Sequence, residues 1–180
     1  AIRERLRLIW MNPTALDPAR QSAKVTREIA ARLAEVSKGL EKRGHDPQEV
    51  ALFLMRCLFT MFAEDVELLP RDSFKELIAK CVRDPQKFGP MVEQLWRASD
   101  KGEFAFAIER PVKRFNGHLF KDSKVLPLRR EEIGELLVAA KHNWKEVEPA
   151  IFGTLLGQAL DEKERARLVL TIHLVPMLSV

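Results

Sequence analysis

The sequence predicts an all-α fold, an irregular multi-helix bundle around a central apolar helix at about residues 47–68. Apolar residues recur at helical spacing in several segments, which is typical of amphipathic helices. Asp accepts hydrogen bonds from the free amides of a first helical turn, and Pro fits the first position, so Asp-Pro pairs mark helix starts. The chain has three such pairs, Asp17-Pro18, Asp46-Pro47 and Asp84-Pro85. At 180 residues, 46% of them hydrophobic, it is long enough for one domain with a real core.

The first helix is expected over about residues 17–43, with Gly44 as its C-terminal stop. Its apolar stripe comprises Val25, Ile29, Leu33, Val36 and Leu40.

The second helix, residues 47–68, differs in kind, because Arg56 is the one charged residue between positions 50 and 62. A helix that is apolar on every side lies at the centre of its domain, so we expect this helix to be buried. Asp46 with Glu49 three residues later resembles a capping box, and Pro70 is expected to end the helix.

The rest of the chain predicts four more helices and one irregular stretch. Helices are expected at 73–82, 85–98 and 130–141, with these inward positions: Phe74, Leu77, Ile78, Val92, Leu95, Trp96, Ile133, Leu136, Leu137 and Ala140. Residues 102–127 are irregular, and 103–108 within them fit either a short strand or a helical turn. Asn116-Gly117 indicates a turn. A last helix is expected at 149–160.

The net charge of +4 is concentrated near the N-terminus, where residues 1–45 hold ten Lys/Arg against five Asp/Glu. Arg20, Lys24 and Arg27 lie away from the apolar stripe and are candidates for contact with the DNA backbone. The alternative is an ordinary solvated helix face. Cys57 and Cys81 fall in apolar helical patterns, which indicates reduced core thiols in a cytoplasmic protein. No apolar run is long enough for a membrane span.

Glu64, Asp65 and Glu67 form a carboxylate cluster, which can bind a metal or move protons. Adjacent helical residues point about 100° apart, so Glu64 and Asp65 are not expected to converge. The favoured interpretation is structural, with capping or with pairing to arginines such as Arg56 and Arg71. The histidines and cysteines lack zinc-ligand spacing, so no metal site is expected on this chain. No Gly-rich phosphate loop or dinucleotide fingerprint is present, so no cofactor is expected either.

Three strings carry a resemblance to a known family. They are Phe62-Ala63-Glu64-Asp65-Val66-Glu67-Leu68-Leu69-Pro70, Phe115-Asn116-Gly117-His118-Leu119-Phe120 and Val147-Glu148-Pro149-Ala150-Ile151-Phe152-Gly153-Thr154-Leu155-Leu156. In this order and spacing they resemble the helical spacer of bacterial type IIG and IIL restriction–modification enzymes, which are adenine-specific DNA methyltransferases. The resemblance covers roughly residues 45–168 and implies that these motif residues are structural. The family usually has Gly where this chain has His118.

The resemblance implies that the chemistry lies outside this chain. The family's nuclease motif contains Glu-x-Lys, which does not occur here, and its Asn-Pro-Pro-aromatic loop is missing, since Asn12-Pro13 is followed by Thr14. S-adenosylmethionine, and Mg²⁺ for a nuclease, are therefore implied only for the parent enzyme, which binds DNA. The implied division is a linker at 1–16, a helical spacer domain at 17–146 and a lead-in helix of a methyltransferase domain at 147–168. An exposed lead-in helix would favour a homodimer.

The tail, residues 169–180, departs from the family string that is expected after Leu168. Deleting one base at the start of one possible coding of GAHYTPRAYVER yields VLTIHLVPMLSV when the last codon is completed, which matches residues 169–180 at every position. The hypothesis is a frameshifted tail; the alternative is an unusual native tail or an artificial end.

The functional hypothesis is a non-catalytic spacer that positions nuclease and methyltransferase modules on DNA. The alternative is a stand-alone helical interaction or adaptor module. An enzyme that uses Glu64, Asp65 and His118 is a third, less favoured reading.

Overall fold

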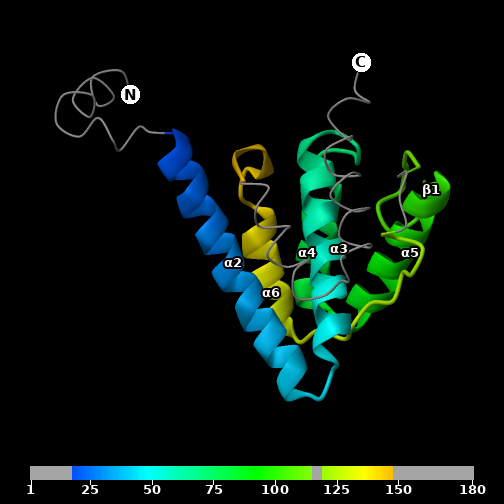
Figure 1. The fold of residues 1–180 in the computed structure, drawn as a ribbon. Helices are drawn as coiled ribbons and strands as arrows, with labels where there is room; N and C mark the ends of the chain where they lie inside the picture. Colours follow the sequence, from blue (N-terminus) through cyan, green and yellow to red (C-terminus); the bar gives the residue numbers. More distant parts are fainter. Residues whose placement is uncertain (1–17, 115–118, 148–180) are drawn as a thin grey trace.

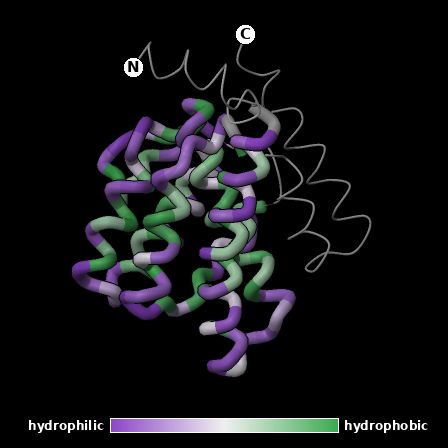
Figure 2. The backbone as a smooth tube through the Cα atoms, turned by 90° about the vertical axis from the view of Figure 1, so that its left-hand side faces the viewer, coloured by the Kyte–Doolittle hydropathy of each residue, from purple (hydrophilic) through white to green (hydrophobic). Residues whose placement is uncertain are grey.

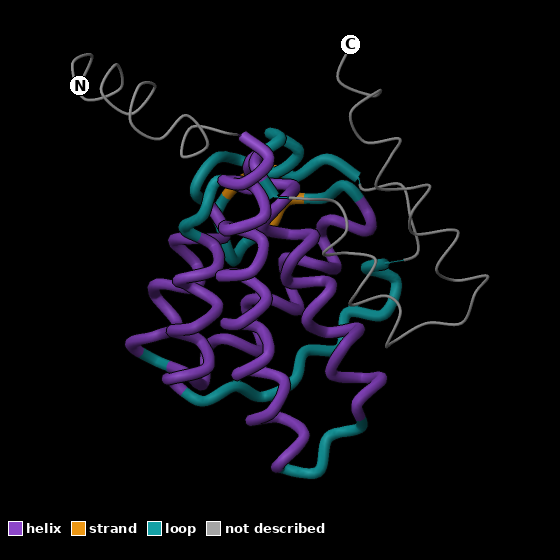
Figure 3. Tube along the Cα trace, turned by 60° about the vertical axis from the view of Figure 1, so that its left-hand side comes forward, coloured by secondary structure: helices purple, strands orange, loops and turns teal. Residues whose placement is uncertain are grey.

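The structure, a computed structural model, describes residues 18–114 and 119–147. Its described helices are α2 (Pro18–Lys42), α3 (Pro47–Asp65), α4 (Ser73–Arg83), α5 (Phe88–Lys101) and α6 (Arg130–Ala140), with short 3₁₀ turns η2 (Pro85–Lys87) and η3 (Trp144–Glu146). One small antiparallel hairpin pairs β1 (Phe104–Ala105) with β2 (Arg110–Pro111). The predicted all-α class is confirmed, and Figure 3 shows how little of the traced chain is strand.

The helices surround α3 (Figure 1). α6 packs against both α2 and α4, while α3 contacts α2, α4 and η3. α5 lies on the side of α3 away from α2 and carries the hairpin. The three-dimensional order therefore differs from the chain order, because α6 returns between α2 and α4.

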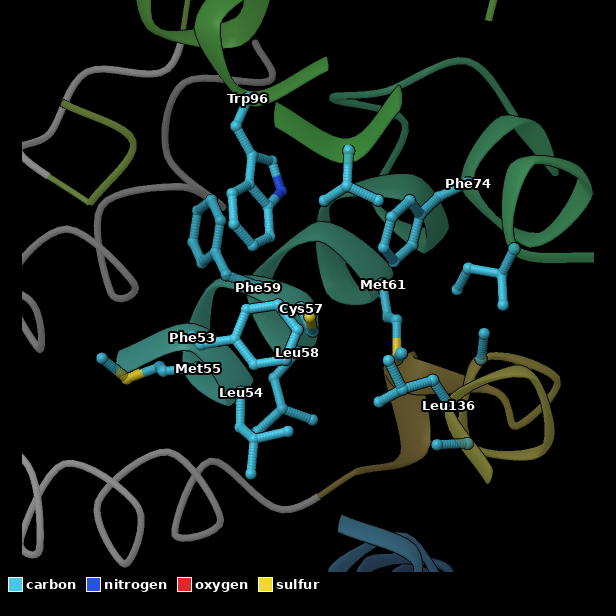
Figure 4. Packing of buried hydrophobic residues seen from close by; sticks show 14 of the residues in the cluster. Phe53, Leu54, Met55, Cys57, Leu58, Phe59, Met61, Phe74, Trp96 and Leu136 are labelled. Atoms are coloured by element: carbon cyan, nitrogen blue, oxygen red, sulfur yellow. The ribbon is translucent and has the colours of Figure 1, made fainter. Parts of the chain in front are cut away.

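α3 is buried on nearly every side, as predicted. Between Val50 and Glu64 every residue is buried except Leu52 and Phe62, which are partly buried. Figure 4 shows Trp96 of α5 beside Phe59. It also shows the Met61 side chain pointing toward Leu136 of α6. Burying a large apolar side chain contributes roughly 1.5–3 kcal/mol, so α3 supplies much of the free energy of folding.

The outer helices are amphipathic, and hydrophilic and hydrophobic residues alternate along their traces (Figure 2). The predicted α2 stripe is confirmed, since Val25, Ile29, Leu33, Val36 and Leu40 are all buried. The inward positions of α4, α5 and α6 are also confirmed, except that Leu137 is only partly buried.

One of the two described Asp-Pro starts behaves as expected. The Asp46 carboxylate accepts from the backbone N–H groups of Gln48 and Glu49 at 2.9 and 3.1 Å. Asp84 makes no side-chain cap, so that prediction was wrong; its carboxylate lies 3.1 Å from Lys87 Nζ. Residues 85–87 form a 3₁₀ turn, and the α-helix expected from 85 starts at Phe88.

The predicted end of α3 was also wrong, since the helix stops at Asp65 and not at Leu68. Glu67 has a φ of 63°, in the left-handed region, and this reverses the chain before Pro70. The Leu68 N–H then donates to the Ala63 carbonyl at 2.8 Å, which satisfies a terminal helix carbonyl.

The 103–108 segment, open between strand and helical turn, holds strand β1. The helix predicted at 149–160 lies outside the described residues. In the described part of the chain, no helix has the length and apolar character to cross a membrane.

Candidate functional site

Arg56 is the one charged residue between Val50 and Phe62 of α3. It holds in place the segment at the end of the second string, residues 119–124. Its side chain is buried, and Nε donates to the Leu119 carbonyl at 3.0 Å. Nη1 donates to the Lys124 carbonyl at 3.2 Å, and Nη2 to Oδ2 of Asp122 at 2.8 Å. The rigid fork of a guanidinium suits three acceptors in different directions. Arg56 therefore fixes residues 119–124 on α3.

A buried aromatic cluster completes this junction. Trp96 Nε1 donates to Thr60 Oγ1 at 2.9 Å, and that hydroxyl donates to the Arg56 carbonyl at 2.7 Å. Phe120, the last residue of the second string, is buried with its ring centroid 5.8 Å from Phe59 and 5.9 Å from Trp96. The Trp96 indole can be buried in the core because its N–H has a hydrogen-bond partner.

Glu64 joins α3 to α4. Its side chain has no exposed surface, and Oε1 accepts from the Phe74 N–H at 2.7 Å. This bond satisfies a free amide of the first turn of α4, where Asp72 gives no side-chain cap. Burial raises the pKa of Glu64 to about 7, and it outweighs the Phe74 N–H and Lys75, which lower it. Oε2 has no hydrogen-bond partner among the described residues and lies 3.8 Å from Lys75 Nζ.

Asp65 joins α3 to the segment that leads into the third string. Oδ2 accepts from the Trp144 N–H at 2.7 Å, and Oδ1 accepts from Lys75 Nζ at 3.1 Å. Trp144 itself is almost fully buried. One carboxylate therefore sets the position of η3, three residues before the third string begins.

The capping alternative is confirmed for Glu64, whose carboxylate accepts from the Phe74 N–H in the first turn of α4, but two other predictions about this cluster were wrong. Glu64 and Asp65 do not pair with Arg56 or Arg71; both approach Lys75, whose ammonium lies within 3.8 Å of each. Arg56 pairs with Asp122, and Arg71 lies 3.9 Å from Asp72. The two carboxylates diverge on α3 itself, but the long side chain of Lys75 from α4 spans the gap between them.

The other motif residues fall into two groups. Leu69 is buried and Phe62 and Pro70 are partly buried at the turn after α3. Phe115, Asn116, Gly117, Glu148, Pro149, Phe152 and Gly153 lie outside the described residues, as do His118 and the 169–180 tail.

The DNA-backbone candidates Arg20, Lys24 and Arg27 are exposed along the start of α2. Lys24 Nζ lies 4.0 Å from Glu28, an exposed pair of the kind that contributes little stability. These residues are not gathered with the α3 cluster.

One further ion pair was not predicted from the sequence. Both terminal nitrogens of the Arg43 guanidinium donate to the Glu132 carboxylate, and Nη2 also donates to the Pro127 carbonyl at 3.0 Å. Glu132 Oε2 also accepts from the Arg129 N–H at 2.8 Å, so the ion pair connects the end of α2 to the start of α6. A Glu at the third position of a helix was the available signal, as in a capping box.

Cys57 and Cys81 are buried free thiols, as expected, and burial raises the pKa of both. Within residues 18–114 and 119–147, no three His, Cys, Asp or Glu side chains are grouped so that they could hold a metal ion. Apart from Oε2 of Glu64, the buried polar side-chain atoms described above hold segments of the chain together.

The comparisons show that part of the chain is similar to a spacer domain. Residues 48–120 match the family model described as "MmeI, helicase spacer domain". This match spans the first two strings, from the start of α3 to Phe120. The predicted resemblance to the spacer region of these DNA methyltransferases is confirmed.

A particular relative is DNA methyltransferase A of Bacillus subtilis (strain 168), which is 28% identical over 181 residues. The alignment covers 92% of this chain but 18% of that protein. No solved structure matches the chain. The chain is thus a region related to restriction–modification methyltransferases, and it spans less than a fifth of the length of this relative.

Proposed function

We propose that this chain is a non-catalytic spacer that sets the distance and orientation between the DNA-modifying modules of a restriction–modification methyltransferase. The observation that carries the proposal is the double anchoring of α3. Arg56 holds residues 119–124, and Asp65 holds Trp144, which lies three residues before the third string. A rigid connection of this kind suits a part whose role is geometric, because small misplacements of reacting groups cost much rate.

The proposal assigns the chemistry to neighbouring modules. S-adenosylmethionine, and Mg²⁺ for a nuclease, would bind there, and the parent enzyme would act on DNA in the cytoplasm. Arg20, Lys24 and Arg27 would lie along the DNA backbone, where such contacts position a protein without reading sequence. A homodimer through residues 147–168 stays a prediction.

An exchange experiment tests the positioning role. Residues 18–147 replace the aligned region of the Bacillus subtilis relative, and DNA methylation is measured in cells and with purified protein. The exchanged protein should methylate DNA, and the same protein with Asp65→Ala should lose most of that activity while keeping its helical circular dichroism. Lys80→Ala, an exposed change on α4, is the matched control.

Two results would contradict the proposal. One is a folded exchanged protein that does not methylate DNA. The other is full activity of the Asp65→Ala form, which would show that the anchored exit from α3 has no bearing on catalysis.

A further inference from the structure

The β1–β2 hairpin presents two phenylalanines to solvent. Phe104 is 46% exposed and Phe106 is 74% exposed, with ring centroids 5.1 Å apart at an interplanar angle of 71°. Among the described residues, Val138 is the other large apolar side chain that is exposed. A paired aromatic surface at one turn is a candidate for contact with a partner.

The hairpin is an ordered element, held to α5 by hydrogen bonds. The Gln94 amide accepts from the Ala107 N–H at 2.9 Å and reaches the Phe104 carbonyl at 3.5 Å. Gly102, with a φ of 76°, allows Arg114 to approach so closely that an added Cβ would lie 2.9 Å from Arg114 Cβ. The exposure of the two rings is therefore built into the fold.

Cations flank the aromatic pair. Lys101, Arg110 and Lys113 are exposed, and none of them has an ion-pair partner among the residues that the structure describes. Arg114 is also exposed and donates from Nε to the Asp100 carbonyl at 3.2 Å. Residues 101–114 contain four Lys/Arg and two Asp/Glu, whereas residues 46–180 as a whole have a slight acidic excess.

We propose that this hairpin is a DNA contact, with its cations on phosphates and the Phe104–Phe106 pair against sugar and base faces in the minor groove. Duplex DNA offers both chemistries at once: a regular array of anions and flat apolar faces that aromatic wedges can reach. A protein partner would need an apolar pocket with an acidic rim. This inference rests on the proposed function for its DNA partner.

The hairpin is separate from the predicted contact on α2. In Figure 1 the two lie at opposite sides of the molecule, with α3 and α6 between them. Variants of one therefore do not disturb the other, and each can be tested alone.

The test uses the 180-residue chain and a fluorescein-labelled duplex of about 20 base pairs, with binding followed by fluorescence anisotropy from about 50 to 200 mM salt. Phe104→Ala with Phe106→Ala should weaken binding by about 10-fold and leave the salt slope unchanged. Arg110→Ala and Lys113→Ala should each lower that slope by about 1.

Val138→Ala and Lys80→Ala are the matched apolar and cationic controls, since both side chains are exposed elsewhere. They should bind DNA as the parent chain does. Circular dichroism and thermal melting show that each variant is folded.

No binding at about 50 mM salt, or hairpin variants that bind like the controls, would overturn the inference. So would loss of self-association, rather than of DNA binding, when the phenylalanines are replaced, because this would show a protein partner. Failure of the exchange experiment together with the expected anisotropy changes would reject the spacer role and leave the hairpin contact standing.

Discussion

The carboxylate of Asp65 accepts a hydrogen bond from the backbone N–H of Trp144, 79 residues later in the chain, at 2.7 Å. The donor is a backbone group, so the bond sets the path of the chain rather than the orientation of one side chain. It ties the end of the central helix to the residues that run toward the third family string.

Asp65→Ala should destabilise the chain by about 1–3 kcal/mol, because the Trp144 N–H is left unpaired in a partly buried place. Asp65→Asn keeps an acceptor and should cost less. Urea unfolding gives the free energies, and amide hydrogen exchange reports on Trp144 directly. Unchanged exchange at Trp144 in the alanine variant would show that the bond does not hold η3.

Glu64 predicts a stability that falls as pH rises. Its pKa is about 7 in the folded chain and near 4.5 in the unfolded one, so between these values the folded state binds more protons. The free energy of unfolding should therefore decrease from about pH 4.5 to pH 7 by an order of 1–3 kcal/mol.

Glu64→Gln removes this titration and keeps an oxygen for the Phe74 N–H. The variant should be more stable than the parent at pH 8. Its free energy of unfolding should change less between pH 5 and 7, and the difference from the parent should be on the order of 1–3 kcal/mol. Denaturant titrations at several pH values measure both. Parallel profiles for parent and variant would contradict the buried, proton-binding carboxyl.

Arg56→Met should destabilise the chain by about 2–4 kcal/mol. Arg56→Lys should lose most of the same stability, because an ammonium does not satisfy three acceptors in the fixed directions of a guanidinium. Asp122 is 67% exposed, so water solvates its charge once the pair is broken, and the cost comes mainly from the Leu119 and Lys124 carbonyls.

Arg97→Lys is the control for that series. Arg97 is exposed and pairs with Glu93 one helical turn away, so this change should cost under about 0.5 kcal/mol. Equal losses from the two Arg→Lys changes would mean that Arg56 acts as a simple charge.

Two helical glycines should respond to alanine with opposite signs. A Cβ at Gly39 would overlap Oε1 of Glu132. The Glu132 carboxylate cannot easily move away, because Arg43 holds Oε1 and the Arg129 N–H holds Oε2. Gly39→Ala should therefore destabilise by about 1–2 kcal/mol, despite the better helix propensity of alanine. At Gly134 of α6 no atom of the described neighbouring residues lies within 4 Å of the Cβ position, so Gly134→Ala should stabilise by about 0.5–1 kcal/mol. Thermal melts of both variants measure the difference, and a common sign would refute the Glu132 contact.

Most of the secondary structure was predictable because its signals are local. The α2 stripe, the apolar character of α3 and the Asp46 cap depend on residues within a few positions of one another. One error arose where the chain turns toward another element: α3 ends early because Glu67 adopts a left-handed conformation as the chain turns toward α4. The other is local, since Asp84 pairs with Lys87 three residues later and does not cap.

The sequence by itself determined the helical class, the central place of α3 and the resemblance to a spacer domain, since periodicity and motif order are written along the chain. The tertiary structure decided which partners the charged residues of α3 take: Arg56 with Asp122, and Asp65 with Trp144 and Lys75. Those partners are 10 to 79 residues away. A local pattern shows that a buried charge needs a partner, but only the packing of helices brings a particular one within hydrogen-bonding distance.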